Sequence, residues 1–284
     1  MTFARKSWSR AIGLACALTL ALSCAIAQAQ LAAPGQKAAK APDGATQSQV
    51  RARALLMEMA KHLASAQRFS VSVRSDYDAV QPSGEKIAFG EVRKVTVSRP
   101  GRLRVEGERS DGARVLTAFT GKEIVLVDLE SKVYATAPQP GDLDRAVTHF
   151  VGDLGIRLPL AALLLSSLPA ALEQRVQSID YVERTSMYGT PAHHLAARTA
   201  TVDFQIWILE GERPLIQRVV ITYKLSRDRP QYRAALSDWN FAPDVSDAVF
   251  ALKPPDGAQK VAFAAQLPRR TLAARAVKAD KGSK

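Results

Sequence analysis

Hydrophobic and polar residues alternate with a period of two through residues 201–241. Phe204, Ile206 and Ile208 alternate with Asp, Gln and Trp, and the returning run at 215–225 alternates in the same way after a turn that contains Gly and Pro. This pattern predicts antiparallel strands with one apolar face. Such a face must be covered by another part of the protein, and how completely it is covered decides what the protein can bind.

Short runs of the same kind fill the segments 69–135 and 179–241, separated by turns rich in Gly, Pro and Asp. Their spacing predicts about six strands in the first segment and about five in the second. In the second strand Val92 is out of phase with its apolar neighbours. We therefore expect a bulge or a bend at residues 90–94, which would curl the sheet.

Helical periodicity occurs in two places. Apolar residues recur on one face of residues 51–63, which predicts an amphipathic helix lying on the sheet. Residues 141–177 form a helical interlude between the two sets of strands, and within it residues 158–165 are apolar on every side. A helix without a polar face must be buried all round or must cover an apolar hollow.

The first 29 residues have the features of a secretory signal peptide. A basic start precedes an apolar run at residues 11–26, and Ala27-Gln28-Ala29 supplies the small residues that a signal peptidase requires. We expect cleavage after Ala29 and export of the protein. Because both cysteines lie in this segment, the mature protein would contain no thiol. A lipoprotein cleavage box ending at Cys24 is the alternative, and it would anchor the chain to a membrane.

Four segments follow from composition. They are a signal peptide at 1–29, a flexible leader at 30–48, one folded domain at 49–261 and a basic tail at 262–284. The net charge of the whole chain is +12, but much of it belongs to the tail, so the body is only mildly basic and we expect no nucleic-acid partner. The tail is either a solvated, disordered end or a contact with an anionic membrane surface.

No pattern of catalytic or metal-ligating residues is found. The sequence contains no glycine-rich phosphate loop, nucleophile elbow or zinc motif. The adjacent His193 and His194 point to opposite faces of a strand, so they cannot ligate one metal together. Asp142 and Asp144 fall in the first turn of a predicted helix, where the helix dipole explains them. We expect a protein that is not an enzyme and that needs no cofactor or metal.

Aromatic and leucine side chains form the candidate site. Aromatic residues on adjacent strands most often form an ordinary core. The alternative is that they line a hollow for an acyl chain, since burying a methylene contributes about 0.8 kcal/mol without a directional partner. The candidate ligand-binding residues are Phe119, Phe150, Leu163, Leu164, Trp207, Tyr223 and Trp239.

Several motifs resemble known families. The segment 99–105, Arg-Pro-Gly-Arg-Leu-Arg-Val, followed by the Asp-Gly turn at 111–112, is similar to the first half of the periplasmic lipoprotein carriers LolA and LolB. The second half, with Ala-His-His-Leu at 192–195 and Asp-Trp-Asn-Phe at 238–241, resembles a family of predicted periplasmic proteins of unknown function. Together these resemblances cover about residues 49–261.

The resemblance implies an α+β, mainly antiparallel fold in the periplasm. It would be a curved, unclosed half-barrel of about eleven strands, with helices covering its concave face over an apolar cavity for acyl chains. Residues 158–167 would form the lid, and a single arginine would hold that lid closed. The sequence does not select that arginine among Arg93, Arg102 and Arg104.

Two functions remain open at this stage. The first is a non-catalytic carrier or binding protein for a lipid or for the acyl chain of a lipoprotein. The second is a sensor or interaction module of the same fold, with an envelope protein as partner and no transported ligand. In both cases we expect a monomer.

Overall fold

The computed structural model describes residues 46–156 and 158–263. The strands before the helical interlude are β1 (Arg68–Val80), β2 (Lys86–Ser98), β3 (Arg102–Arg109), β4 (Arg114–Phe119), β5 (Glu123–Asp128) and β6 (Val133–Pro138). Those after it are β7 (Ser178–Thr185), β8 (Ala192–Arg198), β9 (Val202–Leu209), β10 (Ile216–Tyr223), β11 (Gln231–Asn240) and β12 (Gln259–Lys260). The helices and helical turns are α1 (Gln47–Ser65), α2 (Leu143–Thr148), the π-helical turn η1 (His149–Asp153), the 3-10 turn η2 (Ala161–Leu164), α3 (Leu168–Arg175) and α4 (Asp247–Phe250).

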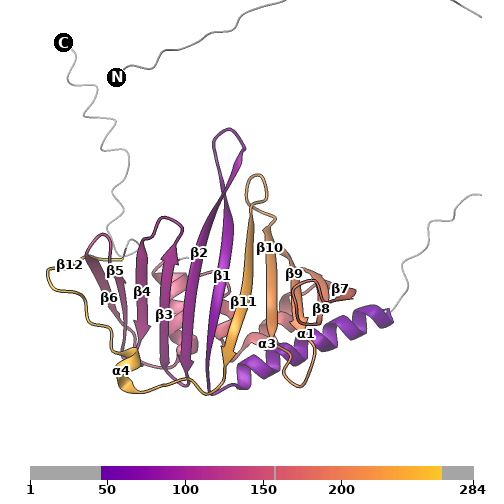
Figure 1. Cartoon of the computed structure of the whole chain (residues 1–284), viewed down its shortest axis with the longest axis horizontal. Coiled ribbons are helices and arrows are strands. Elements are labelled where there is room, and N and C mark those ends of the chain that lie inside the picture. The colour runs from indigo at the N-terminus through magenta and orange to yellow at the C-terminus, as the bar shows by residue number, and fades with distance from the viewer. Residues whose placement is uncertain (1–45, 157, 264–284) are drawn as a thin grey trace, which may run out of the picture. The chain divides into compact units, whose positions relative to one another are not determined.

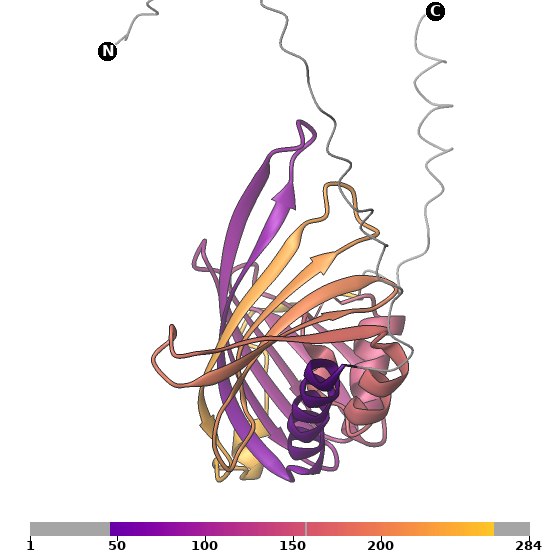
Figure 2. The ribbon, with the colours of Figure 1, turned by 90° about the vertical axis from the view of Figure 1, so that its right-hand side faces the viewer.

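All the strands belong to one sheet in the order β12-β6-β5-β4-β3-β2-β1-β11-β10-β9-β8-β7. Every pair is antiparallel except β12 and β6, which are parallel. The sheet curls, and α1, α2 and α3 lie on its concave side (Figures 1 and 2). Its two edge strands, β12 and β7, do not pair with each other, so the barrel is unclosed. The predicted fold class is confirmed, and the twelfth strand is the two-residue β12, which has too short a pattern to be recognised in the sequence.

Helix α1 forms because its apolar residues share one face and because its first turn is capped. The side chain of Thr46 accepts a hydrogen bond from the backbone N–H of Gln49, and the side-chain oxygen of Gln49 accepts one from the backbone N–H of Thr46. The buried face contributes to the main core cluster; it consists of Ala52, Leu56, Met59, Ala60 and Leu63. The helix therefore covers one part of the concave face, as the sequence pattern predicted.

The predicted bulge at residues 90–94 is wrong. The β1–β2 pairing runs without a shift from Arg68 opposite Ser98 to Val80 opposite Lys86. Val92 simply faces the convex side, where it is 41% exposed. The apolar pattern is interrupted because the inward positions beside it hold charged residues. The irregularity in this part of the sheet lies instead in β11, where the step from Ser237 to Asn240 opposes only the step from Ser72 to Ser70 of β1, and Asp238 has a positive φ of 54°.

The apolar segment 158–165 does not form the predicted helix. It contains a turn followed by the single 3-10 turn η2, and Leu160 has the left-handed backbone angle φ of 65°. Proline is tolerated in the first turn of a helix, so Pro159 alone does not exclude one. The left-handed backbone at Leu160 interrupts helical geometry, and only the short turn η2 follows it. The segment still packs against the main core cluster through Leu163 and Leu164, as its composition indicates.

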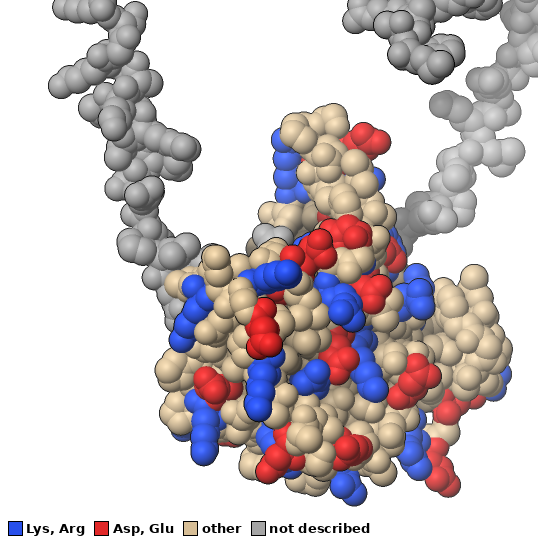
Figure 3. All heavy atoms as spheres, turned by 60° about the vertical axis from the view of Figure 1, so that its left-hand side comes forward, with Lys and Arg blue, Asp and Glu red and all other residues tan. Residues whose placement is uncertain are grey.

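The surface of the sheet carries charges of both signs. Basic and acidic side chains are interspersed on the face shown in Figure 3, without a continuous patch of one sign. No helix in the part of the chain that the structure describes is long and apolar enough to cross a membrane. The predicted signal peptide, the basic tail beyond Phe263 and most of the predicted leader lie outside the described residues.

The docking of α1 can be tested by truncating its buried face. Leu56→Ala should lower the free energy of unfolding by about 2–5 kcal/mol, because Leu56 is 2% exposed and its removal leaves a cavity. Urea denaturation measures this change. Val50→Ala, at a position 57% exposed on the same helix, is the control and should cost about 0.5 kcal/mol or less. Equal effects of the two substitutions would contradict the docking of this face.

Candidate functional site

An apolar cavity of about 180 Å³ lies between the inner face of strands β2 to β5 and the helical interlude. Its walls are mainly aliphatic and aromatic, with a few polar groups from β2, β3 and β4. The residues that line it are Glu91, Arg93, Leu103, Val105, Gly107, Arg109, Val115, Thr117, Phe119, Ile124, Leu126, Ala146, Val147, Phe150, Ile156 and Leu158. Hydrophobic walls with few polar groups are typical of sites for small apolar ligands.

A second, smaller cavity of about 40 Å³ lies beneath the lid segment, residues 158–167. It is bounded by the inner face of β1, β2 and β11 and by the turn η2. Arg93, Val105 and Leu158 line both cavities, so the two volumes adjoin. The concave face therefore retains unfilled space on both sides of these three residues.

Five of the sequence-predicted site residues line these cavities. Phe119, which is 1% exposed, and Phe150, which is 7% exposed, contact the first cavity. Leu163, Leu164 and Trp239 line the second. The structure thus brings together residues from β4, the interlude and β11 that are far apart in the sequence.

Trp207 lies on the opposite face of the sheet. Its neighbours Ile206 and Ile208 point into the main core, so strand alternation directs the indole outward. There it stacks on His194, with ring centroids 4.0 Å apart, and packs edge to face with Tyr188. The sequence pattern already contained this information, because Trp207 occupied the polar phase of its strand.

Tyr223 remains on the concave side but lines neither cavity. It is partly buried and packs against the main core cluster near the end of β10. Its backbone N–H donates to the carbonyl of Pro230 in the following turn. The side chain contributes to the wall of the sheet rather than to either of the two hollows.

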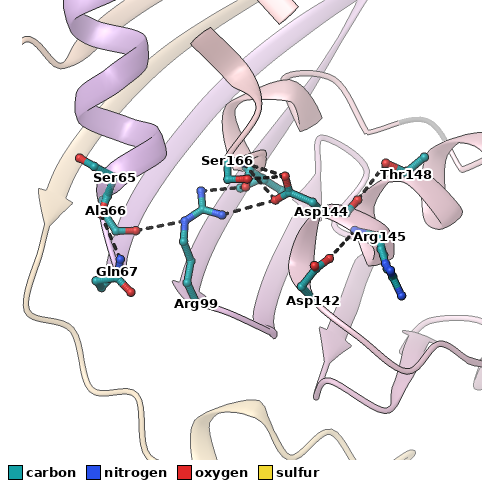
Figure 4. Close-up of polar contacts among 10 residues, drawn as sticks. Ser65, Ala66, Gln67, Arg99, Asp142, Asp144, Arg145, Thr148 and Ser166 are labelled. Carbon is teal, nitrogen blue, oxygen red and sulfur yellow. Dashed lines mark hydrogen bonds and ion pairs between the residues drawn. The ribbon is translucent and has the colours of Figure 1, made fainter. Parts of the chain in front are cut away.

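Arg99 is the polar group that connects the lid to the sheet (Figure 4). It follows β2 directly, and its side chain is 9% exposed. Nε donates to the carbonyl of Ala66 at the end of α1 over 3.1 Å, and Nη2 donates to the carbonyl of Leu164 in η2 over 2.9 Å. One guanidinium thereby joins α1 and the lid segment to the start of the β2–β3 turn.

Asp144 completes this connection. Its carboxylate lies 3.6 Å from Nη1 of Arg99 and accepts hydrogen bonds from the backbone N–H and the hydroxyl of Ser166 in the lid segment. Asp142, by contrast, caps α2 by accepting from the N–H of Arg145. Its position at the helix terminus therefore explains Asp142 fully. Asp144 also binds the lid segment, and its position in the first turn of the helix did not indicate this contact.

The environment of Arg99 explains why its contacts are specific. Burial lowers the pKa of Arg99, and the charge of Asp144 opposes that effect. A desolvated guanidinium needs acceptors for its N–H groups, and the two carbonyls and the carboxylate provide them. Opening the lid would therefore require these groups to find new partners, which water at the opened face can supply.

None of the three arginines considered from the sequence has this position. Arg102 and Arg104 contact α4, through the carboxylate of Asp247 and the carbonyl of Val249 respectively. Arg93 lines both cavities and pairs with Glu91 on the same strand. The usable signal for Arg99 was its place at the head of the Arg-Pro-Gly turn, where a side chain can reach the end of α1.

The histidines have local roles. His149 bonds to Asp153, and His193 bonds to the hydroxyl of Tyr181. Burial lowers the pKa of His193 and of His62, so both are mainly neutral at pH 7. Within residues 46–156 and 158–263, no three His, Cys, Asp or Glu residues lie close enough together to hold a metal ion.

The fold and the cavities define the class of the protein as a helix-covered, unclosed half-barrel. The family model described as "Predicted periplasmic protein (DUF2092)" matches residues 52–264. The chain therefore belongs to this family, and the resemblance seen in the sequence is confirmed. The comparison with curated proteins found no match.

Solved structures of similar proteins include three of interest. The Mycobacterium tuberculosis lipoprotein LppX is 13% identical, with 70% of this chain and 100% of that chain covered and a TM-score of 0.45. A LolA superfamily protein from Nitrosomonas europaea is 11% identical, with 71% and 97% covered and a TM-score of 0.36. MucB in complex with MucA from Pseudomonas aeruginosa is 16% identical, with 71% of this chain and 61% of that chain covered and a TM-score of 0.39.

Replacing Arg99 tests its role in holding the lid. Arg99→Gln should lower the free energy of unfolding by about 1–3 kcal/mol, because the carbonyls of Ala66 and Leu164 lose their donor. It should also increase amide hydrogen exchange in the lid segment. Arg102→Gln, three residues away and paired with the fully exposed Asp247, is the control and should leave exchange in the lid segment unchanged. Unchanged exchange in the lid segment of folded Arg99→Gln would show that Arg99 does not hold it.

Proposed function

We propose that this protein is a periplasmic, non-catalytic carrier or binding protein for a lipid-like ligand, whose acyl chain enters the cavity beneath the helical interlude. The observation that carries the proposal is the apolar hollow of about 180 Å³ between Phe119 and Phe150 on the concave face. An acyl chain suits such walls, because its burial needs no directional partner and each methylene contributes about 0.8 kcal/mol. The family's description as periplasmic supports the location.

The size of the cavity bears on how a ligand would enter. A dry apolar cavity of about 150 Å³ is large enough to bind a guest the size of benzene. The first cavity in its present form is therefore suited to a short segment of hydrocarbon, and a longer chain needs the adjoining space beneath the lid segment. Loading is consequently coupled to displacement of residues 158–167, which Arg99 and Asp144 hold in place.

The second candidate function is a sensor or interaction module of the envelope, with a protein partner and no transported ligand. It would use the same fold, and its cavity would stay empty or would respond to a ligand without transporting it. Lipid extraction and mass spectrometry of the protein isolated from its own periplasm separate the two functions. One amphiphile recovered per protein supports the carrier, and an empty protein that co-purifies with a stable protein partner supports the module.

Filling the first cavity tests the proposed binding site. Ala146 lines it and is 3% exposed, so Ala146→Phe should occupy volume that the acyl chain needs. Displacing about two methylenes should weaken binding of a fluorescent acyl probe by about tenfold. Fluorescence titration measures this change. Ala170→Leu, which adds apolar atoms at an exposed position of α3, should bind the probe as the unmodified protein does. Unchanged affinity in folded Ala146→Phe would contradict this site.

A further inference from the structure

A band of polar groups crosses the inner face of the sheet where the two cavities adjoin. Ser75 on β1 is paired with Glu91 on β2, and Arg93 lies two residues further along the same inward face. The side chains of Glu91 and Arg93 are each 15% exposed. Apolar residues, among them Val95, Leu103 and Val105, follow this band toward the β2–β3 turn, so its charged groups mark a polar end of an otherwise apolar hollow.

The guanidinium of Arg93 is oriented by Glu91. Nε lies 2.7 Å from one carboxylate oxygen and Nη2 lies 2.6 Å from the other. This bidentate contact fixes the plane of the guanidinium, which has five N–H donors in total. The remaining donors have no acceptor within the described part of the chain, and Arg93 lines both cavities.

Tyr232 adds a second donor without a partner. Its side chain comes from β11, lines the second cavity and is 3% exposed, and its hydroxyl makes no hydrogen bond to any described residue. The nearby side chain of Ser75 lowers the pKa of Tyr232, but the two hydroxyl groups do not meet the geometry of a hydrogen bond. Burial raises that pKa, so the hydroxyl keeps its proton at neutral pH. A buried hydroxyl without a partner costs free energy unless a ligand or water accepts its hydrogen bond.

Gly107 keeps the space beside this pair open. It faces the first cavity from β3, where a Cβ atom would lie 3.0 Å from a carboxylate oxygen of Glu91 and 3.7 Å from Cγ of Arg93. Glycine inside a strand weakens the strand, and it is typical of places where another group must approach the backbone closely. Any larger residue at this position would therefore disturb the Glu91–Arg93 contact.

We infer that Arg93, positioned by Glu91, and Tyr232 form a subsite for the head group of an amphiphile, and that this head group bears anionic oxygen as a carboxylate or a phosphate. The inference rests on the proposed function and specifies its ligand class. The subsite presents donors that lack acceptors, which is the complement of an anionic oxygen. The hydrocarbon chain would extend from it into the cavity between Phe119 and Phe150.

Three probes with the same chain and different head groups test this subsite. Dodecanoate, dodecyl phosphate and dodecanol are compared by displacement of a fluorescent acyl probe from the purified protein. The protein should bind at least one of the two anions about tenfold more tightly than the alcohol, because hydrogen bonds to charged groups are the stronger ones. The anion that shows the preference tells a carboxylate source from a phosphate source.

Two variants assign the preference to these residues. The double variant Glu91→Gln with Arg93→Gln removes both charges together, so that no unpaired charge stays buried, and it should bind all three probes within about threefold of each other. Tyr232→Phe should reduce the preference by about threefold, and it decides the assignment if the double variant does not fold. The matched control is Arg104→Gln with Glu106→Gln, which removes an ion pair of the same spacing and of 2.7 Å from the outward face of β3.

The outcomes separate the two proposals. Equal affinity of the unmodified protein for the three probes would overturn the head-group subsite and leave the carrier function standing. A preference that persists in both the double variant and Tyr232→Phe would overturn the assignment to Arg93 and Tyr232. Failure of all three probes to bind would overturn the proposed function together with the subsite.

Discussion

The concave face of an unclosed sheet is the constraint on which the rest of this structure depends. A sheet that curls brings the apolar faces of its strands toward one another, but β12 and β7 do not meet, so the sheet cannot bury that face by itself. The helices must do so, and they cover it unevenly. α1 packs closely at one side, whereas the interlude over β2 to β5 leaves a hollow.

Where the cover is thin, two polar side chains, Arg99 and Asp144, fix the lid segment by hydrogen bonds within mainly apolar surroundings. η2 is too short to satisfy its own backbone, and the carbonyl of Leu164 depends on Arg99. The carboxylate of Asp144 likewise accepts the hydrogen bond of the backbone N–H of Ser166. These anchors add a few directional bonds to the packing of the lid segment's leucines against the core. Such a cover can be displaced at moderate cost, because water can replace each bond once the segment has moved.

The strand pattern made most of the fold predictable from the sequence. Alternation in residues 201–241 and the periodicity of α1 depend on local physical rules, so the strands and the helix were found. The interlude was harder, because apolar composition alone does not distinguish a helix from an irregular cover. The left-handed backbone at Leu160, which breaks the segment, has no signature in the sequence. β12 was missed because its two residues have no pattern. The predicted bulge failed because two charged residues, Glu91 and Arg93, occupy inward positions of a regular strand and pair with each other.

The candidate site was only partly predictable, for a related reason. Phe119, Phe150 and Trp239 follow the inward phase of their elements, whereas Trp207 follows the outward phase and was included for its chemistry alone. Arg99 was not selected, since its place at the head of the Arg-Pro-Gly turn was its one signal. Its partners are backbone carbonyls at Ala66 and Leu164, and backbone groups leave no signature in a sequence. Long-range contacts of this kind become visible only when the chain is folded.

Nuclear Overhauser spectroscopy tests the central claim most directly. A carbon-13-labelled acyl chain is added to the protein, and contacts from its methylenes to protein side chains are recorded. The account predicts contacts to Phe119, Phe150 and Val147, inside the first cavity. Contacts restricted to side chains on the outward face, such as Trp207 and Tyr188, would contradict it.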